Sequence, residues 1–538
     1  MLFRQIEPEP SREHFRRPEE RLFTADQRGS TMVLFGGLTL KHEQLIKACL
    51  ESLGHRCEYL PVPDVRSLQI GKEYSNNGQC NPTYFTVGNL IKYLQQLRDS
   101  GLSTEQILRD YIFVTAGSCG PCRFGMYEAE YRHALGNAGF EGFRIIIFQQ
   151  TQGYSTDEVE AGLRMDFDFF LSLIYSVLLG DLLNEVGCQI RPYEMEKGAT
   201  DSALDQCAEI LYHAIRQRRL WSLKESRLGI LKRIPFFGEL IESTGKFTQL
   251  MLSRHIIEAL EECRQILQRV EVDRTRVTPV VQITGEFWAQ ITEGDGNFNM
   301  FRFLESEGAE IRVNSVSTWL LYVFWGVKAG YRDRFGLKGN RNPLRHFYRL
   351  ARINVAEWVF LKEYVRFCKA LGGTAKSPIP LKELERLGHP YYHSRTQGGE
   401  GYLEVAKSIH AISNNECHMV LSLKPFGCMP STQSDGVMAL VTAHYPDMIF
   451  LPIETAGDGE INAHSRVQMA LGEARRKARD EFDGALQACG YSLKEISEYI
   501  ARHPSLQSAL YKIPRHGEYA GTAANFVTHV ASLMESSP

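Results

Sequence analysis

The chain has 538 residues, too many for one hydrophobic core, because single cores stop growing near ~250–300 residues. Its 61 basic and 64 acidic residues give a net charge of −3 without a sustained basic face, which argues against nucleic acid as a partner. The apolar stretches 169–180 and 319–327 are shorter than the ~20 residues that span a bilayer, so we expect buried helices and no membrane association. The first 20 residues lack the apolar segment of a secretory signal, so we expect a cytoplasmic protein.

Strands and helices alternate through the first part of the chain. Short apolar runs predict strands, and the segments between them have apolar residues at helical spacing. The expected strands are 32–35, 58–62, 111–115 and 143–148, and the expected helices are 41–53, 85–97 and one from about residue 124. This alternation is typical of a parallel sheet covered by helices on both faces.

A second region of the same kind follows a helical stretch. No convincing strand is visible from 157 to 276, whereas 280–284, 418–423 and 448–452 are predicted strands that each lead into a helix. We therefore predict an α/β fold with two parallel-sheet domains and a helical connector. The expected divisions are an N-terminal extension 1–29, a first α/β domain 30–200, a connector 201–275, a second α/β domain 276–490 and a C-terminal helical segment 491–538.

Four of the twelve cysteines lie where a predicted strand leads into a helix. Cys119 and Cys122 belong to the segment Ser118-Cys119-Gly120-Pro121-Cys122, and thiols at a helix N-terminus have a lowered pKa. Cys80 and Cys428 occur in similar turns, each with a proline two residues later. Cys417 precedes an apolar strand and is interpreted as structural, and the remaining cysteines are interpreted as small buried hydrophobes.

Turns after parallel strands meet at one edge of the sheet, where ligands bind. Cys80, Cys119 and Cys122 can therefore converge, and Cys428 would approach from the second domain. Three or four thiolates facing one crevice suit a four-iron four-sulfur cluster, with tetrahedral zinc as the weaker alternative. The interdomain cleft is thus the predicted metal site.

The Cys119-Gly-Pro-Cys122 dithiol also matches the motif of thioredoxin-like oxidoreductases. The proline that faces this dithiol in that family is missing, because no proline occurs between Pro121 and Pro192. A dithiol oxidoreductase therefore stays open as an alternative function. A second alternative is a non-catalytic scaffold that is stabilised by a metal.

Several of these segments together resemble the acyl-CoA dehydratase activase-related proteins, which are related to the 2-hydroxyacyl-CoA dehydratase (2-hydroxyglutaryl-CoA dehydratase) subunits. The resemblance spans most of the chain. The segments that carry it are Gly78-Gln79-Cys80-Asn81-Pro82, Thr86-Val87-Gly88-Asn89-Leu90, Gly120-Pro121-Cys122-Arg123-Phe124-Gly125-Met126-Tyr127, Thr284-Gly285-Glu286 and Phe426-Gly427-Cys428-Met429-Pro430.

The resemblance implies Rossmann-like domains around an iron–sulfur cluster, either four-iron four-sulfur or larger and bridged. It implies Cys80, Cys122 and Cys428 as ligands, with Cys119 as a further candidate. It also implies electrons supplied by a separate ATPase of the actin and Hsp70 superfamily, with a homologous cluster-bearing subunit as a second candidate partner. Whether the chain is itself an enzyme stays open.

Residues near the cysteines are candidates for supporting roles. Arg123 and Lys424 could offset the negative charge of thiolates and sulfides, and Gly427 adjoins Cys428 in the same turn. Glu286, at the end of a predicted strand, either contacts a substrate or caps a helix. The chain has no Gly-x-x-x-x-Gly-Lys-Ser/Thr motif, so we do not expect it to hydrolyse ATP.

Overall fold

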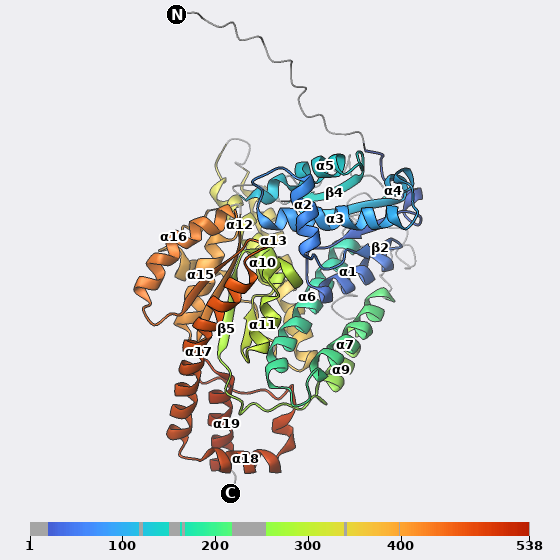
Figure 1. Ribbon diagram of the computed structural model, residues 1–538. Helices are drawn as coiled ribbons and strands as arrows, with labels where there is room; N and C mark the ends of the chain where they lie inside the picture. Colours follow the sequence, from blue (N-terminus) through green and yellow to red (C-terminus); the bar gives the residue numbers. More distant parts are fainter. Residues whose placement is uncertain are drawn as a thin grey trace, which may run out of the picture.

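A computed structural model describes residues 20–117, 122–149, 162–163, 167–217, 254–337, 342–396 and 399–536. Two four-stranded sheets organise the molecule, and every strand pairing in them is parallel (Figure 1). The strands are β1 Met32–Phe35, β2 Arg56–Tyr59, β3 Tyr111–Gly117, β4 Arg144–Gln149, β5 Val280–Gly285, β6 Glu310–Val313, β7 Met419–Pro425 and β8 Phe450–Thr455. The prediction of an α/β fold with two parallel-sheet domains is confirmed.

The two sheets have the same topology. The first has the strand order β2-β1-β3-β4 and the second β6-β5-β7-β8. In each, the chain moves to one side of its first strand and then crosses to the other side, so the order reverses between β1 and β3 and again between β5 and β7. In open α/β sheets, ligands bind at the carboxyl ends of the strands at such a switch point.

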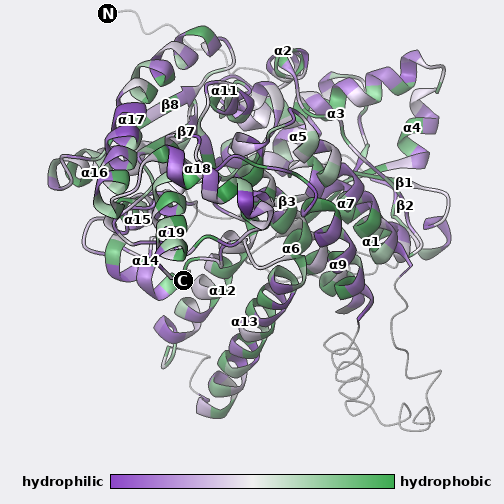
Figure 2. Cartoon of the chain, turned by 90° about the horizontal axis from the view of Figure 1, so that it is seen from below, coloured by the Kyte–Doolittle hydropathy of each residue, from purple (hydrophilic) through white to green (hydrophobic). Residues whose placement is uncertain are grey.

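Helices cover the sheets and connect the two halves (Figures 1 and 2). Their bounds are α1 Leu40–Ser52, α2 Val65–Tyr74, α3 Asn81–Asp99, α4 Thr104–Asp110, α5 Tyr127–Asn137, α6 Phe167–Ile190, α7 Ala199–Arg216, α9 His255–Leu267, α10 Phe287–Ile291, α11 Met300–Ser306, α12 Val316–Asp333, α13 Pro343–Leu371, α14 Leu381–Gly388, α15 Gly401–Ser413, α16 Met429–His444, α17 Glu460–Cys489, α18 Leu493–Arg502 and α19 Thr522–Ser536. Figure 2 shows α13 extending beyond the body of the molecule. The C-terminal helices α17, α18 and α19 share a small core of their own.

Helices α2 and α3 cross at backbone contact because each has a glycine at the crossing. A methyl group on Gly88 would lie 1.9 Å from the carbonyl oxygen of Ser67, and one on Gly71 would lie 1.9 Å from that of Tyr84. Both positions therefore exclude any side chain. This crossing fixes the start of α3, which is the turn that contains Cys80.

Helix α6 is long and apolar enough to cross a membrane, but 72% of its apolar window is buried inside the protein, as in the core helix of a soluble protein. Helix α6 also contacts helix α12, which follows the second strand of the second sheet. The Asp181 carboxylate accepts hydrogen bonds from the backbone N–H groups of Val316 (2.8 Å) and Ser317 (2.7 Å), the first two residues of α12. A carboxylate at this position satisfies amide groups that the helix leaves unpaired and complements its dipole.

Three predicted elements, 58–62, 85–97 and 448–452, differ from the observed bounds by three or more residues at one end, and one strand was missed. Strand β2 ends at Tyr59 because Pro61 and Pro63 follow and lack the N–H that a strand ladder needs. Helix α3 begins at Asn81 instead of 85, with Pro82 in its first turn, where proline is favoured. Strand β8 begins at Phe450 because Met448 donates its N–H to Tyr445 in a turn. Strand β6 was not predicted.

Candidate functional site

The switch points of both sheets face one cavity of about 1370 Å³. Its wall includes Gly36 and Gly37 after β1 and Thr115 near the end of β3 from the first sheet. From the second sheet it includes Glu286 after β5 and Gly427 after β7. The carboxyl ends of four strands thus converge on a single space between the two sheets, the position at which α/β proteins bind ligands.

Three of the four predicted cysteine ligands line this cavity, and each is the N-cap residue of a helix. Cys80 precedes α3, Cys428 precedes α16, and Cys122 precedes a single 3₁₀ turn, Arg123–Met126, that continues into α5. Cys122 and Cys428 follow strands β3 and β7 as predicted, but the predicted strand-to-helix turn at Cys80 is wrong, because helix α2 lies between β2 and this turn. The sequence favours these helix starts because Pro82 and Pro430 lie in the first turns of their helices. The thiols therefore adjoin helix ends that favour negative charge.

Main-chain contacts hold the turns of Cys80 and Cys428 together. The Asn81 N–H donates a hydrogen bond of 3.1 Å to the carbonyl oxygen of Phe426. Gly427 has φ +77°, and a methyl group there would lie 3.5 Å from the Cys80 Cα. The Cys122 turn is close as well, because a methyl group on Gly399 would lie 2.4 Å from the Pro430 ring and 3.8 Å from the Cys122 Cβ. Both sheets thus contribute a thiol to the same region.

Two of the thiols, Cys122 and Cys428, lie in surroundings that keep them protonated in the protein alone. Burial raises the pKa of Cys122 to about 12, against a hydrogen bond from the Phe124 N–H, and the Glu286 carboxyl adds to the increase. Burial and the same carboxyl raise the pKa of Cys428 to about 12. The Cys80 sulfur lies 3.1 Å from the Thr83 hydroxyl and 3.3 Å from the hydroxyl of Tyr127, which is buried.

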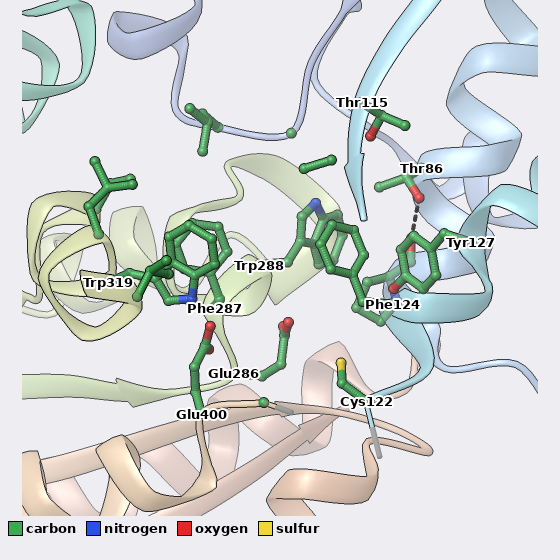
Figure 3. Close-up of a pocket in the computed structure, with 18 of the residues that line it drawn as sticks. Thr86, Thr115, Cys122, Phe124, Tyr127, Glu286, Phe287, Trp288, Trp319 and Glu400 are labelled. Carbon is green, nitrogen blue, oxygen red and sulfur yellow. Dashed lines mark hydrogen bonds between the residues drawn. The ribbon is translucent and has the colours of Figure 1, made fainter. Parts of the chain in front are cut away.

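Two glutamates point into the cavity beside Cys122 (Figure 3). Glu286 is the N-cap of α10, and its carboxylate accepts a hydrogen bond of 2.9 Å from the Ala289 N–H. Burial nevertheless raises its pKa to about 7. Burial and the Glu286 charge raise the pKa of Glu400 to about 8, against hydrogen bonds from Trp319 and the Phe287 N–H. Both carboxyl groups can therefore exchange a proton near neutral pH.

Arg123 and Gly427 also lie at the thiols. The Arg123 guanidinium donates to the carbonyl oxygen of Gly78 and would lie 3.7 Å from a methyl group on Gly427. It therefore adjoins the turns of Cys80 and Cys428 and brings positive charge to this part of the cavity wall. The structure brings these two predicted residues together with Cys80, Cys122 and Cys428.

Lys424 has other partners. Its ammonium is buried and forms ion pairs with Glu404 (3.0 Å between Nζ and Oε1) and with Asp435, and it is absent from the described residues that line the cavity. Its charge is already balanced, which leaves it little role in offsetting a cluster. Cys417 is buried just before β7, at the end of that strand opposite to Cys428. Cys119 lies outside the described residues.

The loop after β1, where many doubly wound folds bind phosphate, is occupied by a side chain of this protein. One carboxylate oxygen of Glu43 accepts hydrogen bonds from the N–H groups of Gly37 (2.7 Å) and Leu38 (3.1 Å). Burial raises the Glu43 pKa to about 8 in spite of these two donors. The amides that a phosphate would use at this turn are thus already paired.

Sequence reasoning missed Glu400 and Tyr127 as site residues. Glu400 follows a loop that looks irregular in sequence, and only the tertiary fold places it beside Glu286. Tyr127 lies five residues after Cys122 at the start of α5, where the sequence predicts that an aromatic residue packs in the hydrophobic core. Its contact with Cys80 joins residues 47 positions apart. Glu286 proves to be a helix cap that also faces the cavity.

No protein-family model matches the chain, and no curated protein matches it. Within the ranges that the structure describes, no three His, Cys, Asp or Glu side chains lie together at the separations of a single metal ion. A cluster separates its thiolate ligands more widely than one ion does, because iron and sulfide lie between them. The site is therefore defined by its thiols, its carboxyl groups and the cavity that they share.

Proposed function

We propose that this protein binds an iron–sulfur cluster between its two sheets and works as a redox protein related to the 2-hydroxyacyl-CoA dehydratase subunits. In this proposal it accepts low-potential electrons from a separate ATP-dependent activase of the actin and Hsp70 superfamily. It then passes them to a substrate or to a homologous cluster-bearing subunit. The observation that carries the proposal is that three cysteines, each the N-cap of its own helix and drawn from both halves of the molecule, line one cavity at the switch points.

The donor set fits such a cluster. Thiolates are the protein ligands of four-iron clusters, and Cys80, Cys122 and Cys428 would supply three of them, with Cys119 as the candidate for the fourth. Coordination deprotonates a thiol outright, which overcomes the burial that keeps Cys122 and Cys428 neutral. When bound, the cluster would supply one-electron transfer. Arg123 and the three helix N-termini would offset its negative charge.

The rest of the site fits this role. Glu286 and Glu400 hold protons that face the cavity, so a substrate that gains an electron there could also gain or lose a proton. Glu43 accepts the hydrogen bonds of the amides after β1, so these amides are not available to bind a phosphate. This agrees with a proposal in which a separate partner hydrolyses ATP. None of the eleven cysteines in the described part of the chain forms a disulfide, as expected in a reducing compartment, and we propose the cytoplasm.

The test is the content of iron and acid-labile sulfide per chain after anaerobic purification. Electron paramagnetic resonance of the reduced protein complements it. We expect Cys428→Ser to lower the iron content or to give a less saturated cluster, because serine is a poor ligand for iron in a sulfur cluster. Cys489→Ser is the matched control. The Cys489 thiol donates a hydrogen bond to the Leu486 carbonyl oxygen at the end of its own helix, so this variant should retain full iron. Wild-type protein without stoichiometric iron and sulfide would contradict the proposal.

The same variants separate the two alternatives. A dithiol oxidoreductase would use Cys119 and Cys122 alone, and thiol trapping across a range of potentials would follow the oxidation of this pair. Its activity should be lost in Cys122→Ser but not in Cys80→Ser. Equal loss in both variants would exclude it. A scaffold would unfold when its metal is removed and would show no redox signal.

A further inference from the structure

The cavity extends well beyond the thiols. At about 1370 Å³ it exceeds the range of roughly 300–1,000 Å³ that is usual for small-ligand pockets. One section of its wall is formed by two helices and is here called the apolar arm. The side chains that define it are Phe169, Phe170, Leu173, Ile174 and Val177 of α6 and Val316, Trp319, Leu320, Val323 and Val327 of α12.

Each helix contributes one continuous face to the apolar arm. Phe169, Leu173 and Val177 recur every four residues along α6, and the five α12 residues of the arm lie on one side of that helix. The other α12 residues that line the cavity are aromatic or glycine, so none of its lining residues from Val316 to Tyr331 is charged. All ten side chains are apolar or aromatic. Such a wall excludes a polar or charged ligand from this section, because the ligand would lose its hydrogen bonds to water without replacement.

The two helices meet at one point and leave space beyond it. Val177 and Val316 belong to one small apolar cluster with Ile291, next to the Asp181 cap of α12. Farther along, Leu173 and Ile174 on α6 and Leu320 and Val323 on α12 are only half-buried although they line the interior cavity. Their remaining surface faces the cavity, so the side chains of the described residues do not fill the space between the opposing faces.

The apolar arm connects the thiol site with the surface. Trp319, near the start of α12, donates a hydrogen bond to Glu400 and lies beside Phe287 in Figure 3. The lining continues to Arg334, just past the end of α12, which is exposed, and to Leu337, which is 59% exposed. From Val316 to Arg334 the helix rises about 27 Å, at 1.5 Å per residue. The arm is long and open at one end.

Resting on the proposed function, we propose that the substrate of the thiol site carries a long-chain acyl group whose hydrocarbon chain lies in the apolar arm between α6 and α12. A single long chain matches the length of the lining on α12, the two opposed apolar faces and the absence of charge on the ten residues that define the arm. The polar side chains beside Cys122, namely Glu286 and Glu400, remain for the functional end of the molecule.

Saturated fatty acids of increasing length serve as probes. Binding of octanoate, dodecanoate and hexadecanoate to the full chain, below their micelle concentrations, is measured by titration calorimetry. We expect affinity to rise by up to about fourfold for each methylene group that becomes buried. Equal affinity for all three probes, or no binding of hexadecanoate, would overturn the inference.

Variants locate the chain. Val323→Trp fills the arm from α12, and Leu173→Trp fills it from α6, so each should weaken hexadecanoate binding at least tenfold and octanoate binding less. Val355→Trp is the matched control, because Val355 is 58% exposed on α13 and is not a lining residue. If both arm variants bind hexadecanoate as the control does, the hydrocarbon chain of the probe lies elsewhere and the inference fails.

Iron analysis distinguishes this inference from the proposed function. Val323→Trp should retain iron and lose hexadecanoate, whereas Cys428→Ser should lose iron and retain hexadecanoate. Wild-type protein that binds iron without chain-length dependence would refute the acyl chain alone. Wild-type protein that binds hexadecanoate in the arm without iron would refute the cluster alone.

Discussion

Replacement of Glu43 by glutamine should change how the stability of the protein depends on pH. The Glu43 carboxyl is 5% exposed, and its pKa is raised from 4.5 to about 8, chiefly by burial. Between these two values the folded protein holds a proton that the unfolded chain releases. The stabilisation is therefore fully present below pH 4.5 and is lost as the pH rises through 8.

The magnitude follows from the size of the shift. Each pH unit between the two pKa values is worth about 1.4 kcal/mol, so this carboxyl alone should lower the free energy of unfolding by about 3 kcal/mol from pH 5.5 to pH 7.5. In Glu43→Gln the side-chain oxygen can still accept from the Gly37 and Leu38 N–H groups, but it no longer titrates. The variant should therefore lose stability less steeply with rising pH than the wild type.

Urea unfolding at pH 5.5, 6.5 and 7.5 measures this difference. Glu286 and Glu400 titrate in the same window, so the relevant quantity is the difference in slope between the two proteins. Glu105→Gln is the control, because Glu105 is exposed on α4 and its replacement should leave the slope unchanged. Parallel profiles for wild type and Glu43→Gln would refute the reasoning.

Two further substitutions test the scaffold of the site. Gly88→Ala would place a methyl group 1.9 Å from the Ser67 carbonyl oxygen, and we expect a loss of more than about 3 kcal/mol in thermal unfolding. Gly436→Ala in α16, where nothing lies within 4 Å, should be neutral or slightly stabilising, and equal effects of the two would contradict the α2–α3 crossing. Asp181→Ala should cost about 3 kcal/mol by leaving the first two amides of α12 unpaired, as measured by urea unfolding. A loss under about 0.5 kcal/mol would show that this cap contributes little.

The parts of the fold that could be predicted are those in which one local pattern decides the structure. Strands β5 and β7 are buried over their whole length, so they appear in the sequence as short runs rich in apolar and β-branched residues. Strand β6 was missed because two of its four residues, Glu310 and Arg312, are charged. They form an ion pair of 2.9 Å between Glu310 Oε1 and Arg312 Nη2, which no local pattern reveals.

The candidate site divides in the same way. Cys122 and Cys428 were found because each lies in a turn after a strand, and the parallel topology brings such turns to one edge. Cys80 also lines the cavity, but it follows helix α2, so the topology rule does not explain its position. Glu400 was not found, because its place beside Glu286 depends on how the two halves pack. The ion pairs of Lys424 also depend on the tertiary fold, because Glu404 belongs to α15 and Asp435 to α16.

The hydrogen bond from the Asn81 N–H to the Phe426 carbonyl oxygen joins the two halves through the backbone alone. No side-chain substitution removes it, except proline at position 81, which would lack the donor. The relative position of the two cysteine turns can therefore persist while the surrounding side chains diverge. In distant relatives this pairing, with a glycine at the position of Gly427, should outlast any recognisable similarity in sequence.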